Sequence, residues 1–254
     1  MTGESARASG GGRDHYSYAH YADKDVAEGF HDLRFGGPIG RYILEREAAW
    51  MAEAIQPAPG LRILDVATGS GRAAIGFAAA GATVIGLDFS REMLRAGRER
   101  VAAAHVNVAL GVADAHRLPI ATQSVDAAVC LRLLMHVIDW RGCVSELCRV
   151  TRSRVVVDFP ALGSAAALES AARHVAHRLG RGREPYRVFA ERDMVAAFAS
   201  HGFRLARTRR LFVLPIALHK AVGLLGLTRA VESALSAVGL SRLFGSPVMM
   251  VFER

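Results

Sequence analysis

Between residues 61 and 160 the chain alternates short apolar runs with segments of helical periodicity, and this alternation limits the fold more than any other feature. The apolar runs are rich in β-branched residues and have the length of strands. We expect strands at Leu61–Val66, Thr83–Leu87, Val106–Gly111, Asp126–Leu131 and Arg154–Phe159. The segments between them predict helices at Arg72–Ala80, Arg91–Ala103 and Gly142–Thr151. Apolar strands that alternate with helices form a mostly parallel sheet with helices on both faces, which is an α/β fold.

The N-terminal part of the chain differs in composition from this segment. Residues 1–14 are small, polar and rich in Gly and Ser, so we expect a flexible tail. Residues 15–58 predict a helical cap, whose helix runs from about Gly40 to Ile55 with apolar residues at three- and four-residue spacing. The sequence Pro57-Ala58-Pro59-Gly60 ends that helix and marks a boundary. We therefore expect the main domain over residues 59–254, with its ligand-binding core at 61–160.

Residues 161–254 predict a helical insertion followed by the last strands of the sheet. Residues 161–188 are Ala-rich, basic and helical in pattern, and a further helix is expected at Arg192–Ser200. Strands are expected at Arg204–Leu214 and Pro247–Phe252. The apolar residues 216–239 are interrupted by charged residues and glycines, which favours an amphipathic helical pair over a membrane-spanning helix.

The most informative segment is Ile63-Leu64-Asp65-Val66-Ala67-Thr68-Gly69-Ser70-Gly71, where a strand ends in a carboxylate and a turn of small residues opens a helix. Small residues allow close approach of a ligand to the backbone, and the helix N-terminus presents unpaired N–H groups. We assign Asp65, Ala67, Thr68, Gly69, Ser70 and Gly71 to a ligand site. A tight turn between strand and helix with no ligand is the alternative interpretation, because such turns also favour glycine.

Two further carboxylates follow the next two strands. Asp88 closes the second strand, where an acid can accept both hydroxyls of a ribose. Asp114 follows the third strand, where it can accept a hydrogen bond from an adenine amino group. Either one alone is commonly a turn or N-cap residue. Three acids at the carboxyl ends of successive strands nevertheless predict a ligand-binding edge, because open α/β sheets bind ligands there.

The charge at the glycine turn separates two classes of ligand. The spacing Gly69-x-Gly71-x-x-Ala74 fits the pattern of dinucleotide-binding enzymes, so an NAD-dependent oxidoreductase is one alternative. That pattern places a pyrophosphate at the turn, where the carboxylate of Asp65 would repel it. A nucleoside that carries a cationic amino acid is therefore favoured over NAD.

These residues resemble the class I S-adenosylmethionine-dependent methyltransferases. Asp65 to Gly71 is similar to their D/E-x-G-x-G-x-G motif, with Ala67 in place of the first glycine. The residue sequence of this turn is similar to that of ubiquinone/menaquinone-type methyltransferases. The same holds for residues 113–119 and 124–129. Those quinone-methylating enzymes follow strand four with Arg-Asn, whereas this chain has Arg132-Leu133.

The resemblance implies a Rossmann-like sheet of seven strands and S-adenosylmethionine as the cofactor. It implies Asp65 near the methionine ammonium, Gly69 and Gly71 under the cofactor, Asp88 on the ribose and Asp114 by the adenine. Phe89, Ala115 and Leu131 are added to the cofactor site. The implied activity is methyl transfer to an oxygen, carbon or nitrogen atom of a small lipophilic or anionic acceptor. A protein that binds S-adenosylmethionine without catalysis would keep the same cofactor residues and is a further alternative.

Residues of the acceptor side are assigned by their position. His136 lies just past the fourth strand and is the candidate general base, with helix capping or packing as the alternative. Tyr18, Tyr21, Arg132 and Tyr186 are the candidate acceptor-binding residues. The aromatic ones among them have the simpler alternative of a place in the core.

Charge is distributed unevenly along the chain, whose formal net charge is +8. Residues 149–254 carry 17 Lys and Arg against 7 Asp and Glu, whereas residues 1–148 carry 15 against 17. The basic half is the acceptor half, which suggests an anionic acceptor or an anionic membrane surface, with a solvated basic face as the alternative. Aromatic residues are not interleaved with the basic ones, so we do not expect a nucleic-acid partner. The spacing of the three cysteines matches no metal site or disulfide framework, which predicts no metal and a cytoplasmic location.

Overall fold

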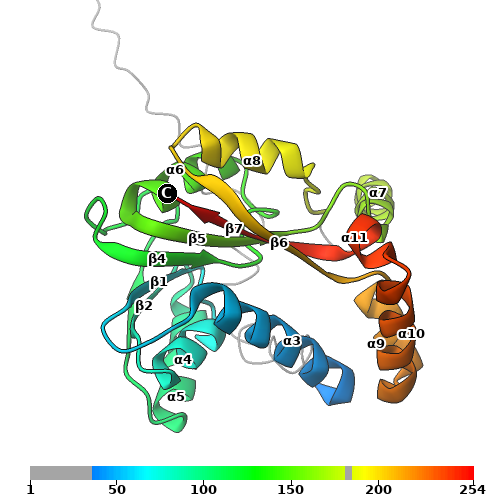
Figure 1. Cartoon of the computed structure of the whole chain (residues 1–254), viewed down its shortest axis with the longest axis horizontal. Helices are drawn as coiled ribbons and strands as arrows, with labels where there is room; N and C mark the ends of the chain where they lie inside the picture. The colour runs from blue at the N-terminus through cyan, green and yellow to red at the C-terminus, as the bar shows by residue number, and fades with distance from the viewer. Residues whose placement is uncertain (1–35, 181–184) are drawn as a thin grey trace, which may run out of the picture.

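The computed structural model describes residues 36–180 and 185–254, which form a seven-stranded sheet with helices on both faces (Figure 1). The strand order is β3-β2-β1-β4-β5-β7-β6. The strands are β1 (Arg62–Val66), β2 (Thr83–Asp88), β3 (Val108–Val112), β4 (Val125–Cys130), β5 (Thr151–Phe159), β6 (Arg204–Phe212) and β7 (Ser246–Glu253). Strands β1 to β5 are parallel to one another, whereas β7 runs antiparallel to both β5 and β6. The predicted mostly parallel sheet of seven strands is therefore confirmed.

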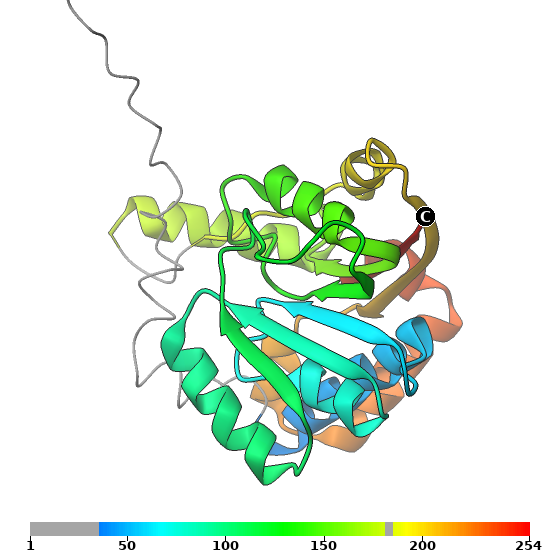
Figure 2. The same ribbon diagram turned by 90° about the vertical axis from the view of Figure 1, so that its left-hand side faces the viewer.

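Helices cover the two faces of this sheet in separate layers (Figures 1 and 2). The described helices are α3 (Gly37–Ile55), α4 (Arg72–Ala79), α5 (Arg91–Ala103), α6 (Trp140–Val150), α7 (Ala165–Arg178), α8 (Glu191–Ala199), α9 (Ile216–Val222), α10 (Leu225–Ala237) and α11 (Leu240–Phe244). In Figure 1, α3, α4 and α5 lie below the sheet and α6 and α8 lie above it. Among the described residues, no helix combines the length and apolarity that crossing a bilayer requires.

Two apolar clusters, one on each face of the sheet, form the core. Successive strand residues point to opposite faces, so Val155 and Val157 of β5 join the cluster under α6 and α8. Val156, between them, joins the cluster under α3 and α4. Both faces of the central strands are therefore buried, which explains why those strands are apolar without interruption.

The structure corrects several predicted boundaries. The helix predicted to run through Thr151 ends at Val150, and Thr151 is already the first residue of β5, paired with Val125 of β4. Strand β4 ends at Cys130, one residue before the prediction, because Arg132 takes a left-handed backbone conformation with φ of 58°. The helix predicted over 161–188 is confined to α7, which begins after the N-cap Ser164 and ends before Gly180, whose φ is 68°.

Helical structure in the apolar residues 216–239 is confirmed as α9 and α10. The predicted tail at residues 1–14 and the first part of the predicted cap, including Tyr18 and Tyr21, lie outside the described residues. Of the predicted cap, helix α3 is described, and it begins at Gly37 with a proline in its first turn.

Candidate active site

An open cavity lies at the carboxyl ends of β1, β2 and β4. Its lining includes ten residues that were assigned from the sequence, namely Ala67, Thr68, Gly69, Ser70, Asp88, Phe89, Ala115, Leu131, Arg132 and His136. Nine further residues line it that the sequence argument did not assign, namely Val66, Arg72, Leu87, Ser90, Met93, Ala113, Leu118, Leu133 and Val137. Apolar side chains predominate among the nine, as is usual in the walls of small-molecule sites.

The glycine turn after β1 takes a left-handed backbone at three of its positions. Ala67, Gly69 and Gly71 have φ values of 58°, 56° and 78°. Ala67 occupies the place of the first glycine of the family motif, and a non-glycine residue in this conformation carries backbone strain. A Cβ atom on Gly69 would lie 3.1 Å from Cε of Met93 on α5, so glycine also keeps the turn close to that helix. Gly71 is the N-cap of α4 and does not line the cavity.

Asp65 lies beneath the turn and is only 2% exposed. Its carboxylate accepts a hydrogen bond of 2.7 Å from the hydroxyl of Thr68, which does line the cavity. Burial raises the pKa of Asp65 to about 6, and the Thr68 hydroxyl and the Arg72 guanidinium oppose that rise. Asp65 therefore does not line the cavity itself. The hydrogen bond that it accepts from Thr68 connects it to the cavity wall.

Asp88 links the end of β2 to the glycine turn. Its Oδ2 accepts a hydrogen bond of 2.8 Å from the backbone N–H of Gly69, and its Oδ1 accepts one of 2.8 Å from the N–H of Ser90. Burial raises the pKa of Asp88, and these backbone donors oppose the rise. A carboxylate has about four lone-pair positions, so with backbone donors from Gly69, Ser90 and Phe89 it can still accept a ligand hydroxyl.

Asp114 lies at the rim of the site and does not line the cavity. Its Oδ1 accepts a hydrogen bond of 2.9 Å from the backbone N–H of His116. The same oxygen lies 2.8 Å from Nδ1 of the His116 ring. Its neighbours Ala113 and Ala115 line the cavity instead. The carboxylate therefore shapes the loop that carries these two residues.

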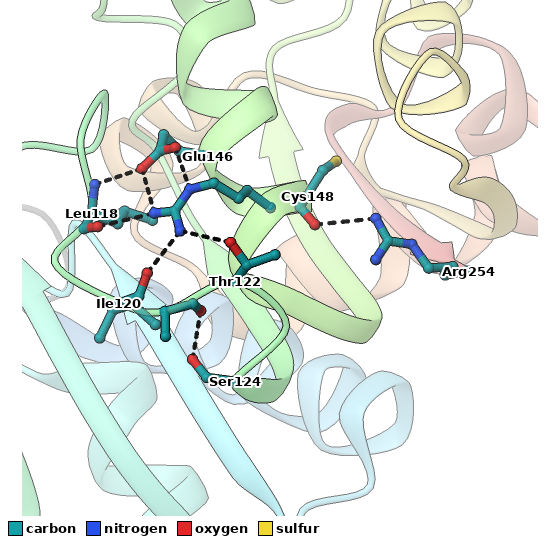
Figure 3. A network of polar contacts seen from close by, with 9 residues as sticks. Leu118, Ile120, Thr122, Ser124, Glu146, Cys148 and Arg254 are labelled. Carbon is teal, nitrogen blue, oxygen red and sulfur yellow. Dashed lines mark hydrogen bonds and ion pairs between the residues drawn. The ribbon is translucent and has the colours of Figure 1, made fainter.

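The loop after β3 is held by an ion pair on α6 (Figure 3). Glu146 accepts a hydrogen bond of 2.7 Å from the N–H of Leu118, a residue of the cavity wall. Arg149 donates to the carbonyl oxygens of Leu118 and Ile120 at 3.0 and 2.8 Å, and to Glu146. The hydrogen bond from Arg149 lowers the pKa of Glu146, so the carboxylate stays charged. This i, i+3 pair on one helix face was not recognised in the sequence.

A buried ion-pair cluster joins α3 to the cavity. Glu47 of α3 is 4% exposed and lies 2.9 Å from a guanidinium nitrogen of Arg72 and 3.1 Å from one of Arg132. The backbone N–H of Arg132 donates a short hydrogen bond to the carboxylate of Asp158 at the end of β5. Burial and the nearby Arg132 together lower the pKa of Arg72 to about 10, against the opposing effect of Glu47.

The burial of Glu47 could have been predicted from the spacing of residues on α3. Ile43, Glu47 and Met51 recur every four residues on one face of α3, and Ile43 and Met51 are both buried. A single acid within such an apolar stripe indicates a buried carboxylate with a cationic partner. The partners Arg72 and Arg132 follow β1 and β4, so only the tertiary fold reveals them.

The structure separates the candidate acceptor residues. His136 and Arg132 line the cavity, next to the apolar Leu133 and Val137. Tyr186 is not brought to this cavity: its hydroxyl donates to the carbonyl oxygen of Ala166 at 3.1 Å, and its ring packs against Arg173 at 5.0 Å. Tyr186 is 9% exposed and holds the loop before α8 against α7. Within residues 36–180 and 185–254, no three His, Cys, Asp or Glu side chains are grouped so as to hold a metal ion.

Comparisons with known proteins show what this domain is similar to. Residues 63–154 match the family described as Methyltransferase domain. A demethylmenaquinone methyltransferase of a Parafrankia species is 39% identical over 117 residues, which cover 40% of this chain and 46% of that protein. The chain thus spans about half the length of the curated relatives it matches.

Two solved structures show the same fold at low sequence identity. A magnesium protoporphyrin IX methyltransferase from Synechocystis, solved with bound S-adenosylmethionine, is 17% identical with a TM-score of 0.60, covering 99% of this chain and 100% of that one. A putative sarcosine dimethylglycine methyltransferase from Galdieria sulphuraria is 15% identical with a TM-score of 0.63, covering 92% and 98%. Residues 63–154 are therefore similar to a methyltransferase domain, and the two solved structures show that the chain has the fold of these enzymes.

Proposed function

We propose that the chain binds S-adenosylmethionine in the cavity at the carboxyl ends of β1, β2 and β4, and transfers its methyl group to a small organic acceptor. The observation that carries this proposal is the pair of acids at the glycine turn. Asp88 is fixed by the turn itself with a lone pair available for a ribose hydroxyl, and Asp65 lies under the turn, where a cationic ligand is favoured.

The remaining residues of the cavity fit the other parts of this cofactor. Phe89, Met93 and Leu118 provide apolar surface next to Asp88, as a flat adenine ring requires. The guanidinium of Arg72 lines the same cavity near Asp65, and a cation there suits the carboxylate of a bound amino acid. A pyrophosphate fits less well, because the carboxylate of Asp65 lies under the turn that would hold it.

When bound, the cofactor's sulfonium supplies an electrophilic methyl group, so the protein's task is positioning and the exclusion of water. Leu131, Leu133 and Val137 form an apolar wall that excludes water from this part of the cavity. His136 lies on the same wall, and we assign it the role of accepting the proton that an acceptor hydroxyl or amine loses. Arg132 is held by Glu47 and borders the same space, where it can contact an anionic acceptor.

We propose an acceptor with an apolar body, for which the wall around His136 is the supporting observation. Residues 161–254 are assigned to the acceptor side, since α7 and α9 follow the carboxyl ends of β5 and β6, at the edge where the cavity opens. The similar demethylmenaquinone methyltransferases carry a quinone precursor in their name. The match to them covers about half of each chain, so we extend to this protein the class of small apolar acceptor and not the quinone itself.

Calorimetry with S-adenosylmethionine, S-adenosylhomocysteine and NAD tests the cofactor. We expect micromolar binding of the first two and none of NAD; binding of NAD alone would refute the proposal. A labelled-methyl assay with an acceptor library tests the transfer. Binding of the cofactor without transfer to any apolar, anionic or polar acceptor would favour the non-catalytic alternative.

A further inference from the structure

Helix α10 buries two polar side chains and exposes a row of apolar ones. Its buried side chains are polar: Thr228 is 2% exposed and Glu232 is 5% exposed. The opposite face carries a row of exposed apolar residues at three- and four-residue spacing, namely Leu227, Ala230, Ala234 and Ala237. A surface helix normally buries its apolar stripe and exposes its polar one. An apolar row that includes Leu227 therefore faces outward from α10, beside the exposed Arg229, Ser233 and Ser236.

The segments on either side of α10 also carry exposed apolar residues. We define the α9–α11 surface as the exposed large apolar residues of this region, namely Leu218, Val222, Leu224, Leu227, Val238, Leu243 and Phe244. Leu218 and Val222 are four residues apart and so lie on one face of α9. Leu224, in the connection from α9 to α10, is 60% exposed and Val238, after α10, is 72% exposed. An exposed group of this size marks an interaction site.

The pair of helices is held together from inside, so the exposure is not a sign of a loosely attached segment. Nε2 of His219 on α9 lies 2.9 Å from Oε1 of Glu232 on α10. The same carboxylate accepts hydrogen bonds from the N–H groups of Val213 and Leu214 at 2.9 and 3.0 Å. Glu232 therefore fixes both helices to the end of β6 and has no surface charge to offer.

Basic residues outnumber acidic ones in this region. From Met194 to Phe252 the segment holds one acid, the buried Glu232, against seven Lys and Arg. Arg209 of β6 and Arg242 of α11 border a hollow that also includes the hydroxyl residues Ser233, Ser236 and Ser241. Glu191 lines the same hollow and is paired with Arg210. Guanidinium and hydroxyl groups together are the donors that phosphate groups accept from.

We propose that the α9–α11 surface docks onto an anionic phospholipid bilayer. Leu224, Leu227 and their apolar neighbours enter the headgroup boundary, and Arg209 and Arg242 contact lipid phosphates at its edge. Charge complementarity selects this occupant: a second copy of the chain would bring an equally basic surface against this one. Helix α9 follows the carboxyl end of β6, which runs parallel to the strands that end at the cavity, so docking places the membrane beside the cavity.

Vesicle co-sedimentation tests this proposal without any cofactor or acceptor, so its outcome is independent of the proposed methyl transfer. The probes are vesicles of phosphatidylcholine alone and of phosphatidylcholine with about one-third phosphatidylglycerol. We expect the full chain to bind the anionic vesicles at least about tenfold more tightly than the neutral ones, and to lose most of that preference between about 0.1 M and about 0.5 M salt.

Two double variants and one control separate the apolar and electrostatic parts. Leu224→Glu with Leu227→Glu, and Arg209→Glu with Arg242→Glu, should each weaken binding to anionic vesicles about tenfold or more. The control Leu205→Glu changes an exposed leucine near the start of β6, far along the strand from α9, and should bind as the wild type does. Thermal unfolding and S-adenosylhomocysteine binding check that each variant is folded.

Three results would overturn the proposal. The first is a folded wild type that does not sediment with anionic vesicles at low salt. The second is equal loss of binding in the Leu205→Glu control. The third is a wild-type dimer, detected by light scattering, that the Leu224→Glu and Leu227→Glu variant dissociates while vesicle binding is absent; this would assign the surface to a second copy of the chain.

Discussion

Asp88, at the end of β2, accepts a 2.8 Å hydrogen bond from the backbone N–H of Gly69, in the middle of the glycine turn after β1. The two residues are 19 positions apart, and their bond ties together the two strand ends that form one wall of the cavity. The second oxygen of Asp88 accepts from Ser90, which begins α5. One carboxylate therefore sets the shape of the turn and offers a remaining lone pair to a ligand.

Replacing Asp88 by asparagine tests this double role. An amide has one acceptor oxygen, so one of the two backbone donors would face an NH₂ group. We expect the affinity for S-adenosylhomocysteine to fall roughly 10- to 100-fold, corresponding to about 1–3 kcal/mol for a lost charged hydrogen bond. Calorimetry measures it. Asp126→Asn is the matched control, because Asp126 also accepts from a backbone N–H, that of Arg62, but at an exposed position away from the cavity. Equal losses in both variants would contradict the assignment.

The raised pKa of Asp65 predicts that the free energy of unfolding depends on pH. Burial raises its pKa in the folded chain from 3.8 to about 6, so the folded state holds this proton more tightly than the unfolded state does. The resulting stabilisation is complete below the unfolded pKa of 3.8 and is lost as the pH rises through about 6. Relative to Asp65→Asn, the wild type should therefore lose roughly 2 kcal/mol of unfolding free energy between pH 4 and pH 7. Urea unfolding of both proteins across that range measures it, and parallel curves would contradict it.

The sequence predicted the sheet and the glycine turn because both rest on local patterns. Apolar strands, a turn of small residues and an acid after each strand are visible within a few residues of each other. Asp88 and Gly69 could be placed at one edge because parallel strands end together. The start of β5 was misplaced because pairing with β4 extends the strand back to Thr151, and the end of β4 because the backbone turns at Arg132. The local pattern signals neither.

The rest of the cavity depended on contacts across the fold. Glu47, Arg72 and Arg132 come from three separate elements, and no spacing in the sequence relates them. Tyr186 is an aromatic residue near a predicted loop, but its hydroxyl finds a partner in α7 and its ring is buried. Side-chain partners of this kind follow from packing and not from residue type, so sequence alone does not distinguish a pocket aromatic from a core one.

The buried Glu47 cluster predicts a large effect on stability from one substitution. Glu47→Gln leaves the guanidinium groups of Arg72 and Arg132 without their shared counterion, although their side chains are only 14% and 20% exposed. We expect a loss of about 2–4 kcal/mol in unfolding free energy, slightly below the range for fully buried pairs because both arginines retain some contact with water. Urea unfolding at pH 7 measures the loss.

The matched control is Glu53→Gln on the same helix. Glu53 pairs with Arg207 at the surface, where the two side chains are 63% and 44% exposed. An exposed pair contributes less than about 1 kcal/mol, so this variant should remain close to the wild type. A similar loss in the two variants would show that α3 tolerates neither change and would contradict a special role for Glu47.

A side chain at Gly86 of β2 would collide with Thr68 in the glycine turn after β1. A Cβ atom at this position of β2 would lie 2.8 Å from Cδ2 of Leu110 and 2.9 Å from Oγ1 of Thr68. Gly86→Ala should therefore cost about 1–3 kcal/mol of stability and weaken S-adenosylhomocysteine binding by displacing Thr68. Gly76→Ala in α4 is the control: its Cβ would have no neighbour within 4 Å, and alanine should stabilise the helix by roughly 0.5–1 kcal/mol. Urea unfolding compares them, and a stable Gly86→Ala variant would contradict the predicted clash.

His136 predicts a separation between catalysis and cofactor binding. Its side chain borders the cavity together with Leu133 and Val137. If it accepts a proton from the acceptor, His136→Ala should lower the rate of methyl transfer by roughly 10²- to 10⁴-fold, as loss of a general base does. The affinity for S-adenosylhomocysteine should change less than about threefold. A labelled-methyl assay and calorimetry on the same preparations measure the two quantities, with His201→Ala at an exposed position as the control. Near-normal transfer by His136→Ala would remove the assignment and leave positioning by the apolar wall as the chain's contribution.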